Sequence, residues 1–318
     1  MIGISIGDAN GVGPEILLRA YAEGLVPGDF IAVGDLSALR KYDEILGSNT
    51  PLNVLGDPSG FRPGQLNVYD AGALSAEDVT PGRIDSKVGA AALHYIRECA
   101  DRSLAGEFEA MVTLPVNKEA IRLTKSGFSG HTGYIADLAE TTNYTMMLVS
   151  DRLIVTHVTT HVSLREALDR VKKGRIIDVI ELTDEAIKKL RPRRRIAVAG
   201  LNPHAGEGGA FGREEIEEIA PAVAEARQEG FDAYGPVPPD TVFHQAITGE
   251  YDAVVCMYHD QGHIPLKLLG FESGVNVTLG LPFVRTSVDH GTAYDIAGKG
   301  IASLTSFRNA CNLALELK

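Results

Sequence analysis

Three histidines are the side chains whose type and position in this sequence point most directly to chemistry. His161, His204 and His259 each follow a run of apolar residues that predicts a buried strand. Because functional groups gather where the strands of an α/β sheet end, three such imidazoles could meet and bind a divalent metal. An open position on that metal would take a substrate oxygen. The alternative is three unrelated loop histidines, since the spacing forms no local motif.

Two cations and an amide lie in otherwise apolar runs of the C-terminal part. Lys267 and Arg285 are lone cations, and Asn276 stands between two valines. An unpaired buried charge is costly, so each cation predicts a partner anion. That anion is either an internal carboxylate or a bound phosphate or carboxylate. In the second case the guanidinium of Arg285 could donate two parallel hydrogen bonds to the anion, and the ammonium of Lys267 would supply a single positive charge.

The segment of His131 and Thr132, preceded by a glycine, opens a predicted helix. Amide groups at a helix N-terminus, together with a threonine hydroxyl, favour an anion. A simple helix cap is the alternative for this segment.

Two glycine-containing motifs near the N-terminus are not counted as sites. The turn at residues 7–15 lacks the full GxGxxG pattern, so it does not predict a dinucleotide-binding fingerprint. Ser5 lies in a GxSxG match inside a predicted strand, whereas a nucleophile elbow places its serine on a strand-to-helix turn. A strand serine is the better interpretation.

The elements that must position these residues alternate between strands and helices. Short apolar runs predict strands, including a hairpin at 146–149 and 153–158, and amphipathic stretches predict helices such as those near 14–23, 87–102 and 174–190. This alternation is typical of an α/β fold with much parallel sheet.

Composition sets the class of protein. The 318 residues carry 30 Lys and Arg against 42 Asp and Glu, a formal charge of −12, which makes nucleic acid and anionic membranes poor default partners. The three cysteines have no metal-ligand or disulfide spacing, so we expect reduced thiols in the cytoplasm. The first residues predict a strand rather than a signal peptide, and no run is long enough to span a membrane.

Several longer motifs resemble the 4-hydroxythreonine-4-phosphate dehydrogenase (PdxA) family, and the resemblance runs from residue 2 to about 303. The segments that carry it are GHT at 130–132, LPVNK at 114–118, NPHAGE at 202–207, GP at 235–236, PDT at 239–241, YHDQG at 258–262, GLPFVRTS at 280–287 and DHGTA at 289–293.

The resemblance implies a two-lobed α/β fold similar to isocitrate and isopropylmalate dehydrogenases, with an active-site cleft between lobes at a dimer interface. We expect residues 1–125 with 296–318 in one lobe and 126–295 in the other, the second lobe carrying the metal and phosphate residues. The implied partner is a second copy of the chain in a homodimer.

The resemblance also assigns roles to residues of this sequence. The family's divalent metal (Zn, Mg, Mn or Co) falls on the three histidines named above. Asp240, which reaches across the dimer, and Lys267 are the candidate catalytic residues, with Asp240 a candidate general base. The contacts to the phosphorylated substrate fall on His131, Thr132, Lys267, Asn276 and Arg285.

The loop at 290–300 is similar to the adenosine-binding loop of isopropylmalate dehydrogenases. It implies NAD as cofactor, with Gly291, Thr292 and Asp295 as its contacts. Asp295 would accept from the ribose hydroxyl and repel the 2′-phosphate of NADP.

The implied reaction is NAD-dependent oxidation and decarboxylation of a four-carbon 4-phosphorylated 3-hydroxy acid, 4-hydroxythreonine 4-phosphate in pyridoxal phosphate synthesis. Departures from the family pattern, among them Gly133 and the run at 263–271, favour as an alternative the branch that acts on D-threonate or D-erythronate 4-phosphate. A metal-dependent hydrolase, a non-catalytic binding protein and a dehydrogenase for a carboxylated cis-dihydrodiol are further alternatives; the basic phosphate-pocket residues argue against the last.

Overall fold

The computed structural model describes residues 1–318, apart from the side chain of Pro58. The chain folds into two compact units, which are described separately. Unit 1 comprises Met1–Thr142, Leu281–Glu316 and Lys318, and unit 2 comprises Asn143–Gly280 with Leu317. Both units alternate strands with helices, so the predicted α/β class is confirmed.

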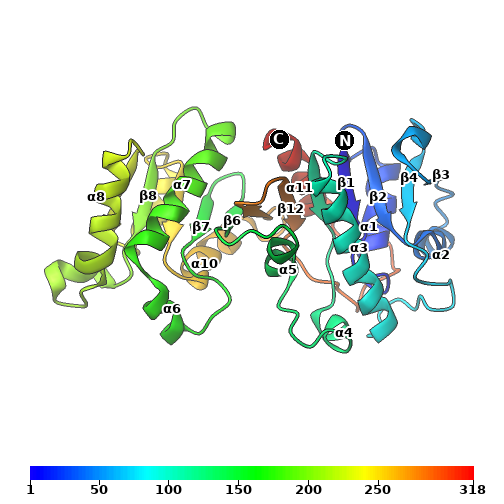
Figure 1. Ribbon diagram of the computed structural model, residues 1–318, viewed down its shortest axis with the longest axis horizontal. Coiled ribbons are helices and arrows are strands. Elements are labelled where there is room, and N and C mark those ends of the chain that lie inside the picture. The colour runs from blue at the N-terminus through cyan, green and yellow to red at the C-terminus, as the bar shows by residue number, and fades with distance from the viewer. The chain divides into compact units, whose positions relative to one another are not determined.

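Unit 1 contains a parallel sheet with strand order β3-β4-β2-β1-β5-β12. Its central strands are short apolar runs that are buried throughout, as parallel strands covered on both faces must be. In Figure 1 the helix α3 lies along this sheet, and α11 brings the C-terminal end back beside β12. Its elements are β1 (Ile2–Ser5), α1 (Gly13–Ala22), β2 (Phe30–Gly34), α2 (Leu36–Leu46), β3 (Leu52–Leu55), η1 (Pro58–Gly60), β4 (Leu66–Asp70), α3 (Ser86–Leu104), β5 (Ala110–Thr113), α4 (Lys118–Arg122), α5 (His131–Leu138), β12 (Val284–Val288) and α11 (Thr305–Glu316).

Unit 2 contains strands in the order β11-β6-β7-β10-β8-β9. The pairs β11·β6 and β6·β7 are antiparallel, which confirms the predicted hairpin, and the remaining pairs are parallel. Helices α7 and α8 pack against each other beside β8 to β10 (Figure 1). Its elements are β6 (Thr145–Val149), β7 (Ile154–His157), α6 (Leu164–Arg170), α7 (Lys173–Leu190), β8 (Ile196–Ala199), η2 (Pro203–Gly209), η3 (Glu215–Ile219), α8 (Ala220–Gln228), β9 (Ala233–Val237), α9 (Val242–Ile247), β10 (Ala253–Cys256), α10 (His259–Gly270) and β11 (Val275–Leu279).

The division into units differs from the lobe boundaries expected at 125/126 and 295/296. Helix α5 packs on α3, and β12 pairs in parallel with β5, so both elements belong to unit 1. His131, Thr132 and Arg285 therefore lie in unit 1, whereas the three histidines at strand ends lie in unit 2.

The three cysteines, Cys99, Cys256 and Cys311, are free and buried. Burial raises the pKa of each thiol well above its ordinary value. Among the helices described, none combines the length and the apolar character that crossing a membrane requires.

Candidate functional site

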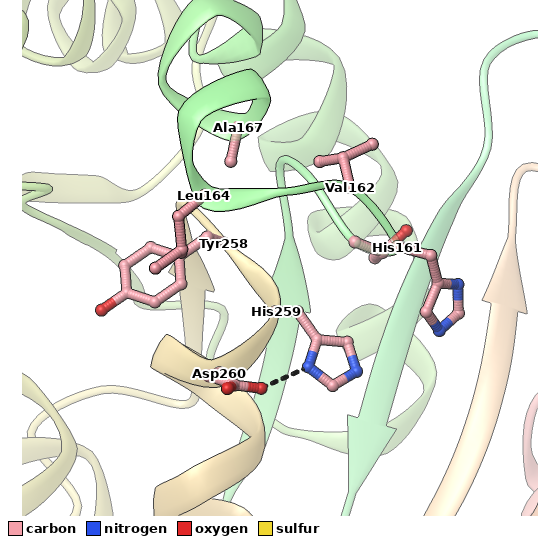
Figure 2. Close-up of a pocket in the computed structure, with 8 residues that line it drawn as sticks. His161, Val162, Leu164, Ala167, Tyr258, His259 and Asp260 are labelled. Carbon is pink, nitrogen blue, oxygen red and sulfur yellow. Dashed lines mark hydrogen bonds and ion pairs between the residues drawn. The ribbon is translucent and has the colours of Figure 1, made fainter.

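His161 and His259 line one cavity in unit 2. His161 follows β7, His259 follows β10, and these parallel strands are neighbours in the sheet, so both residues stand at the same edge. Their ring centroids are 5.5 Å apart. Figure 2 shows both rings at the cavity, whose volume is about 250 Å³. The cavity is lined by Thr160, His161, Val162, Leu164, Ala167, Tyr258, His259 and Asp260.

The ring of His259 is oriented by two neighbours. Its Nδ1 lies 2.6 Å from the Asp260 carboxylate, which accepts the Nδ1 hydrogen (Figure 2). On one side the ring stacks on His263, with centroids 3.5 Å apart and planes 12° from parallel. A neutral imidazole that donates from Nδ1 keeps a lone pair on Nε2, and a carboxylate at Nδ1 is the usual support of a metal-binding histidine. The donor chemistry of this pair of histidines therefore fits a divalent metal.

Two buried histidines, His157 and His263, lie next to His259 inside unit 2. His157 Nδ1 lies 3.1 Å from the carbonyl oxygen of Met146 and must donate to it, so Nε2 accepts from His263 Nδ1 at 3.2 Å. His263 Nδ1 is also 2.9 Å from the carbonyl oxygen of His259. Burial, followed by the charge of His263, lowers the pKa of His157 to about 3. His157 is thus a neutral core residue with both nitrogens in hydrogen bonds.

His204 occupies a different setting. It is exposed, in the η2 segment that follows β8, and its ring contacts Phe211 at a centroid distance of 6.3 Å. Within the part of the chain that the structure describes, no three His, Cys, Asp or Glu side chains are grouped as a ready metal site. The structure brings together two of the three predicted ligands, and the third stays a prediction.

Arg285 is the central cation of a second group of candidate residues, in unit 1. It lies on β12, only 1% exposed, and its Nη2 donates to the hydroxyl of Thr113 at 2.6 Å. Burial lowers the pKa of Arg285 to about 9. A guanidinium this deeply buried presents several fixed donors, which suits a planar or tetrahedral oxyanion.

His131 and Lys118 lie in the same region of unit 1. His131 begins α5, and its Nε2 is buried without a hydrogen-bond partner. Burial, then the charges of Arg285 and Lys118, lowers the pKa of His131 well below its ordinary range. Lys118 lies beside the start of α5. Its Nζ would be 3.5 Å from a Cβ built on Gly130, the residue that precedes this helix. Lys118 was not expected from the sequence, although it ends the LPVNK motif.

The lowered pKa of His131 predicts a pH dependence. In the folded state the ring stays neutral, whereas in the unfolded chain it gains a proton below about pH 6.5, so stability falls as the pH drops through this value. His131→Asn should make the melting temperature fall less between pH 7.5 and 5.5 than in the wild type. Melting curves of both proteins at several pH values test this, and identical slopes would contradict it.

The other expected phosphate contacts and the expected base lie in unit 2. Lys267 is on α10, two turns after His259, with its Nζ 5.4 Å from the ring centroid of Phe271. Asn276 is on β11, and its Oδ1 is buried without a hydrogen-bond partner. Asp240 is exposed in the turn between β9 and α9. All three keep the roles predicted for them as expectations.

The loop expected to bind the cofactor is firmly attached to unit 1. Glu15 is fully buried and accepts from the backbone amides of Gly298 at 2.9 Å and Ala302 at 3.0 Å. The Tyr294 hydroxyl donates to Asp8 at 2.8 Å. Asp295 remains exposed on this loop, where a ribose hydroxyl can reach it, so the residues present fit an adenosine.

Comparison with known proteins decides the family. A family model described as "Pyridoxal phosphate biosynthetic protein PdxA" matches residues 28–314. This chain belongs to the PdxA family. The PdxA resemblance of the sequence motifs is thereby confirmed.

Three PdxA relatives illustrate the range of names within the family. The chain is 44% identical to a D-threonate 4-phosphate dehydrogenase of Pectobacterium atrosepticum, over 100% of this chain and 99% of the relative. It is 45% identical to a 4-hydroxythreonine-4-phosphate dehydrogenase of Desulfosudis oleivorans, over 99% of this chain and 95% of the relative. A crystal structure of a 4-hydroxythreonine-4-phosphate dehydrogenase from Klebsiella pneumoniae superposes with a TM-score of 0.89 at 45% identity, covering 100% and 97%.

The names of these PdxA relatives are those of dehydrogenases, as expected for an oxidoreductase acting on a CH–OH group. Identities of 44% and 45% do not separate the two substrates. Asp260 and His263 were not expected from the sequence as supports of His259, although a carboxylate adjacent to His259 and a histidine four residues later on the same helix were visible signals.

Proposed function

We propose that this chain catalyses the NAD- and divalent-metal-dependent oxidation of a four-carbon 3-hydroxy acid that carries a 4-phosphate, followed by loss of carbon dioxide. The observation that carries the proposal is the His161 and His259 pair at the cavity of unit 2, with His259 oriented by Asp260. The names of its relatives in the PdxA family support the same reaction class.

In the proposed reaction the chain's residues bind, orient and move a proton. We expect Arg285, with His131 and Thr132 at the start of α5, to hold the phosphate; Lys267 and Asn276 are the further contacts expected from the resemblance. A divalent ion on His161, His204 and His259 would polarise the substrate hydroxyl as a Lewis acid. NAD on the loop at 290–300 would accept the hydride.

The proton of the C3 hydroxyl passes to a base, for which Asp240, exposed in the turn between β9 and α9, is the candidate that the family resemblance implies. Once C3 is a ketone, the carboxylate lies β to it, and the C1–C2 bond breaks to release carbon dioxide. The electron pair of that bond forms an enolate, and C2 then takes up a proton to give the ketone product. The product is 3-amino-2-oxopropyl phosphate when C2 carries an amine, and dihydroxyacetone phosphate when C2 carries a hydroxyl.

A direct assay tests the proposal. The protein is first stripped of metal with a chelator and then supplied with NAD and either D-threonate 4-phosphate or 4-hydroxythreonine 4-phosphate. Each mixture is assayed with and without Mg²⁺, Mn²⁺, Co²⁺ or Zn²⁺. NADH should form only when metal is restored. Release of inorganic phosphate without NADH would instead identify a metal-dependent hydrolase and overturn the proposal.

The proposal includes a homodimer, supported by an apolar stripe on α10. Ile264 and Leu268 on α10 and Phe271, the residue directly after it, are 65%, 84% and 72% exposed, and their spacing continues one face of the helix. Apolar side chains grouped in this way usually mark an interaction surface.

Leu268→Asp should therefore shift the protein from dimer toward monomer, because a carboxylate cannot be buried against this stripe without a large desolvation cost. Light scattering after gel filtration measures the mass directly. Leu104→Asp, at another exposed leucine on α3, is the control that should keep the wild-type mass. An unchanged dimer in Leu268→Asp would remove α10 from the interface.

A further inference from the structure

The segment that carries His204 has an unusual backbone. Six consecutive residues, 204–209, have positive φ values, and three of them are not glycine: His204 at 53°, Ala205 at 52° and Glu207 at 44°. The left-handed region is unfavourable for residues with a Cβ, and single residues rather than runs usually visit it. Such a run persists only where the surroundings enforce it, and strain of this kind is concentrated at functional sites.

The buried carboxylate of Glu215 holds the backbone of this segment in place. Glu215 is 2% exposed, and its Oε1 accepts from the backbone amides of Leu201 and Asn202, each at 2.7 Å. Its Oε2 accepts from the Asn202 side-chain amide at 2.9 Å. These bonds fix the strand exit immediately before the left-handed run.

The carboxylate also fits closely under the run itself. A Cβ placed on Gly206 would lie 2.8 Å from Glu215 Oε2, so the backbone of Gly206 packs directly on this oxygen. Only a glycine accepts both this approach and its φ of 81°. The loop therefore closes over Glu215 from both of its ends.

A π-helical turn explains how the carboxylate reaches this position. Glu215 begins η3, and its neighbour Glu214 also accepts from the Asn202 side-chain amide, at 2.7 Å. Two consecutive carboxylates converge on one asparagine at the start of this turn. Turns of this type are often retained where they direct a side chain to a functional site.

His204, by contrast, is exposed, and its ring lies 6.3 Å from the ring of Phe211, centroid to centroid. Its position is consequently set by the backbone that Glu215 holds. We infer that Glu215 is the positioning residue that presents His204 for metal binding, an inference that rests on the proposed metal role of His204.

The test compares Glu215→Ala with Glu215→Gln and a matched control. Glu217→Ala removes an exposed carboxylate from the same π-helical turn, where it pairs with Arg213 at 2.6 Å. Amide hydrogen exchange in the metal-free proteins reports on Leu201 and Asn202, and a Co²⁺ titration followed by visible absorbance reports on the metal.

In Glu215→Ala the two amides should exchange at least about tenfold faster, because their acceptor is gone. The Co²⁺ dissociation constant should rise about 10- to 100-fold, the usual effect of losing a group that supports a metal ligand. Glu215→Gln should lie between Glu215→Ala and the wild type, since its side-chain oxygen still accepts both amides. Glu217→Ala should match the wild type in both measurements.

A purely structural role would lower the melting temperature of Glu215→Ala while leaving the Co²⁺ affinity and absorption spectrum of the folded protein unchanged, and that result would overturn the inference. Unchanged exchange of the two amides would overturn it as well. If Glu215→Ala does not fold, Glu215→Gln decides by the same criteria. Absence of Co²⁺ binding in the wild type would refute the metal role itself, and the exchange data would still show whether Glu215 holds the loop.

Discussion

Replacing His259 with alanine is expected to lower the rate of NADH formation at least about 100-fold, the consequence of losing several kcal/mol of transition-state stabilisation by a metal. His259 is the histidine that the structure orients best, since it donates to Asp260 at 2.6 Å and stacks on His263. Steady-state assays at saturating metal, NAD and substrate measure the effect.

His94→Ala is the matched control, because His94 is exposed on α3 and belongs to unit 1, whereas the residues that line the cavity belong to unit 2. It should retain wild-type activity. Asp260→Asn should fall between the two, since an amide oxygen still accepts from Nδ1 but carries no charge. Full metal-dependent activity of His259→Ala would remove this histidine from the site.

Arg285→Met is expected to raise the KM for the phosphorylated substrate about 10- to 150-fold, the equivalent of about 1.5–3 kcal/mol for hydrogen bonds to a charged group. The methionine fills much of the same volume on β12 but cannot donate to an oxyanion. The second readout is the rise in melting temperature on adding inorganic phosphate, which the variant should lose.

Lys125→Met makes the same change of charge and shape at an exposed lysine near α5, where the ammonium lies 5.3 Å from the ring centroid of Tyr134. It should keep the wild-type KM and the wild-type response to phosphate. If Arg285→Met keeps both as well, Arg285 has a structural role only.

The strands and helices that the sequence predicts best are those with a clean apolar pattern. The hairpin of β6 and β7 and the parallel strands β8 and β10 are such runs. Strands β3 and β4 were not predicted, because each carries an asparagine among its apolar residues. In the fold, Asn53 donates to Asn67 at 2.7 Å, so both amides are satisfied inside the unit.

Strand β9 was missed for a related reason. Its sequence, Ala-Tyr-Gly-Pro-Val, contains the glycine and proline that normally break a strand, yet it pairs with β8 at the edge of the sheet. Proline is tolerated at an edge because its missing N–H faces no neighbouring strand.

Of the candidate site, the placement of histidines after strands was predictable, because parallel strands bring their carboxyl ends to one edge. The support of these histidines was not. The left-handed run at 204–209 and the role of Glu215 depend on packing between segments about ten residues apart, which no period in the sequence reports. For Arg285 the sequence predicted a partner anion and left open whether it is an internal carboxylate or a bound anion; in the fold Arg285 is 1% exposed on β12 and donates to the hydroxyl of Thr113.

The measurement that tests the central proposal most directly is kcat/KM for NAD reduction with a panel of four-carbon acids. 4-Hydroxythreonine 4-phosphate, D-threonate 4-phosphate and D-erythronate 4-phosphate are compared with the same acids lacking phosphate. We expect metal-dependent NADH formation with at least one phosphorylated acid, and a kcat/KM at least about 100-fold lower for its unphosphorylated form, because the contacts of Arg285 and His131 are then unused. No turnover of any phosphorylated acid, or equal turnover of both forms, would contradict the proposed function.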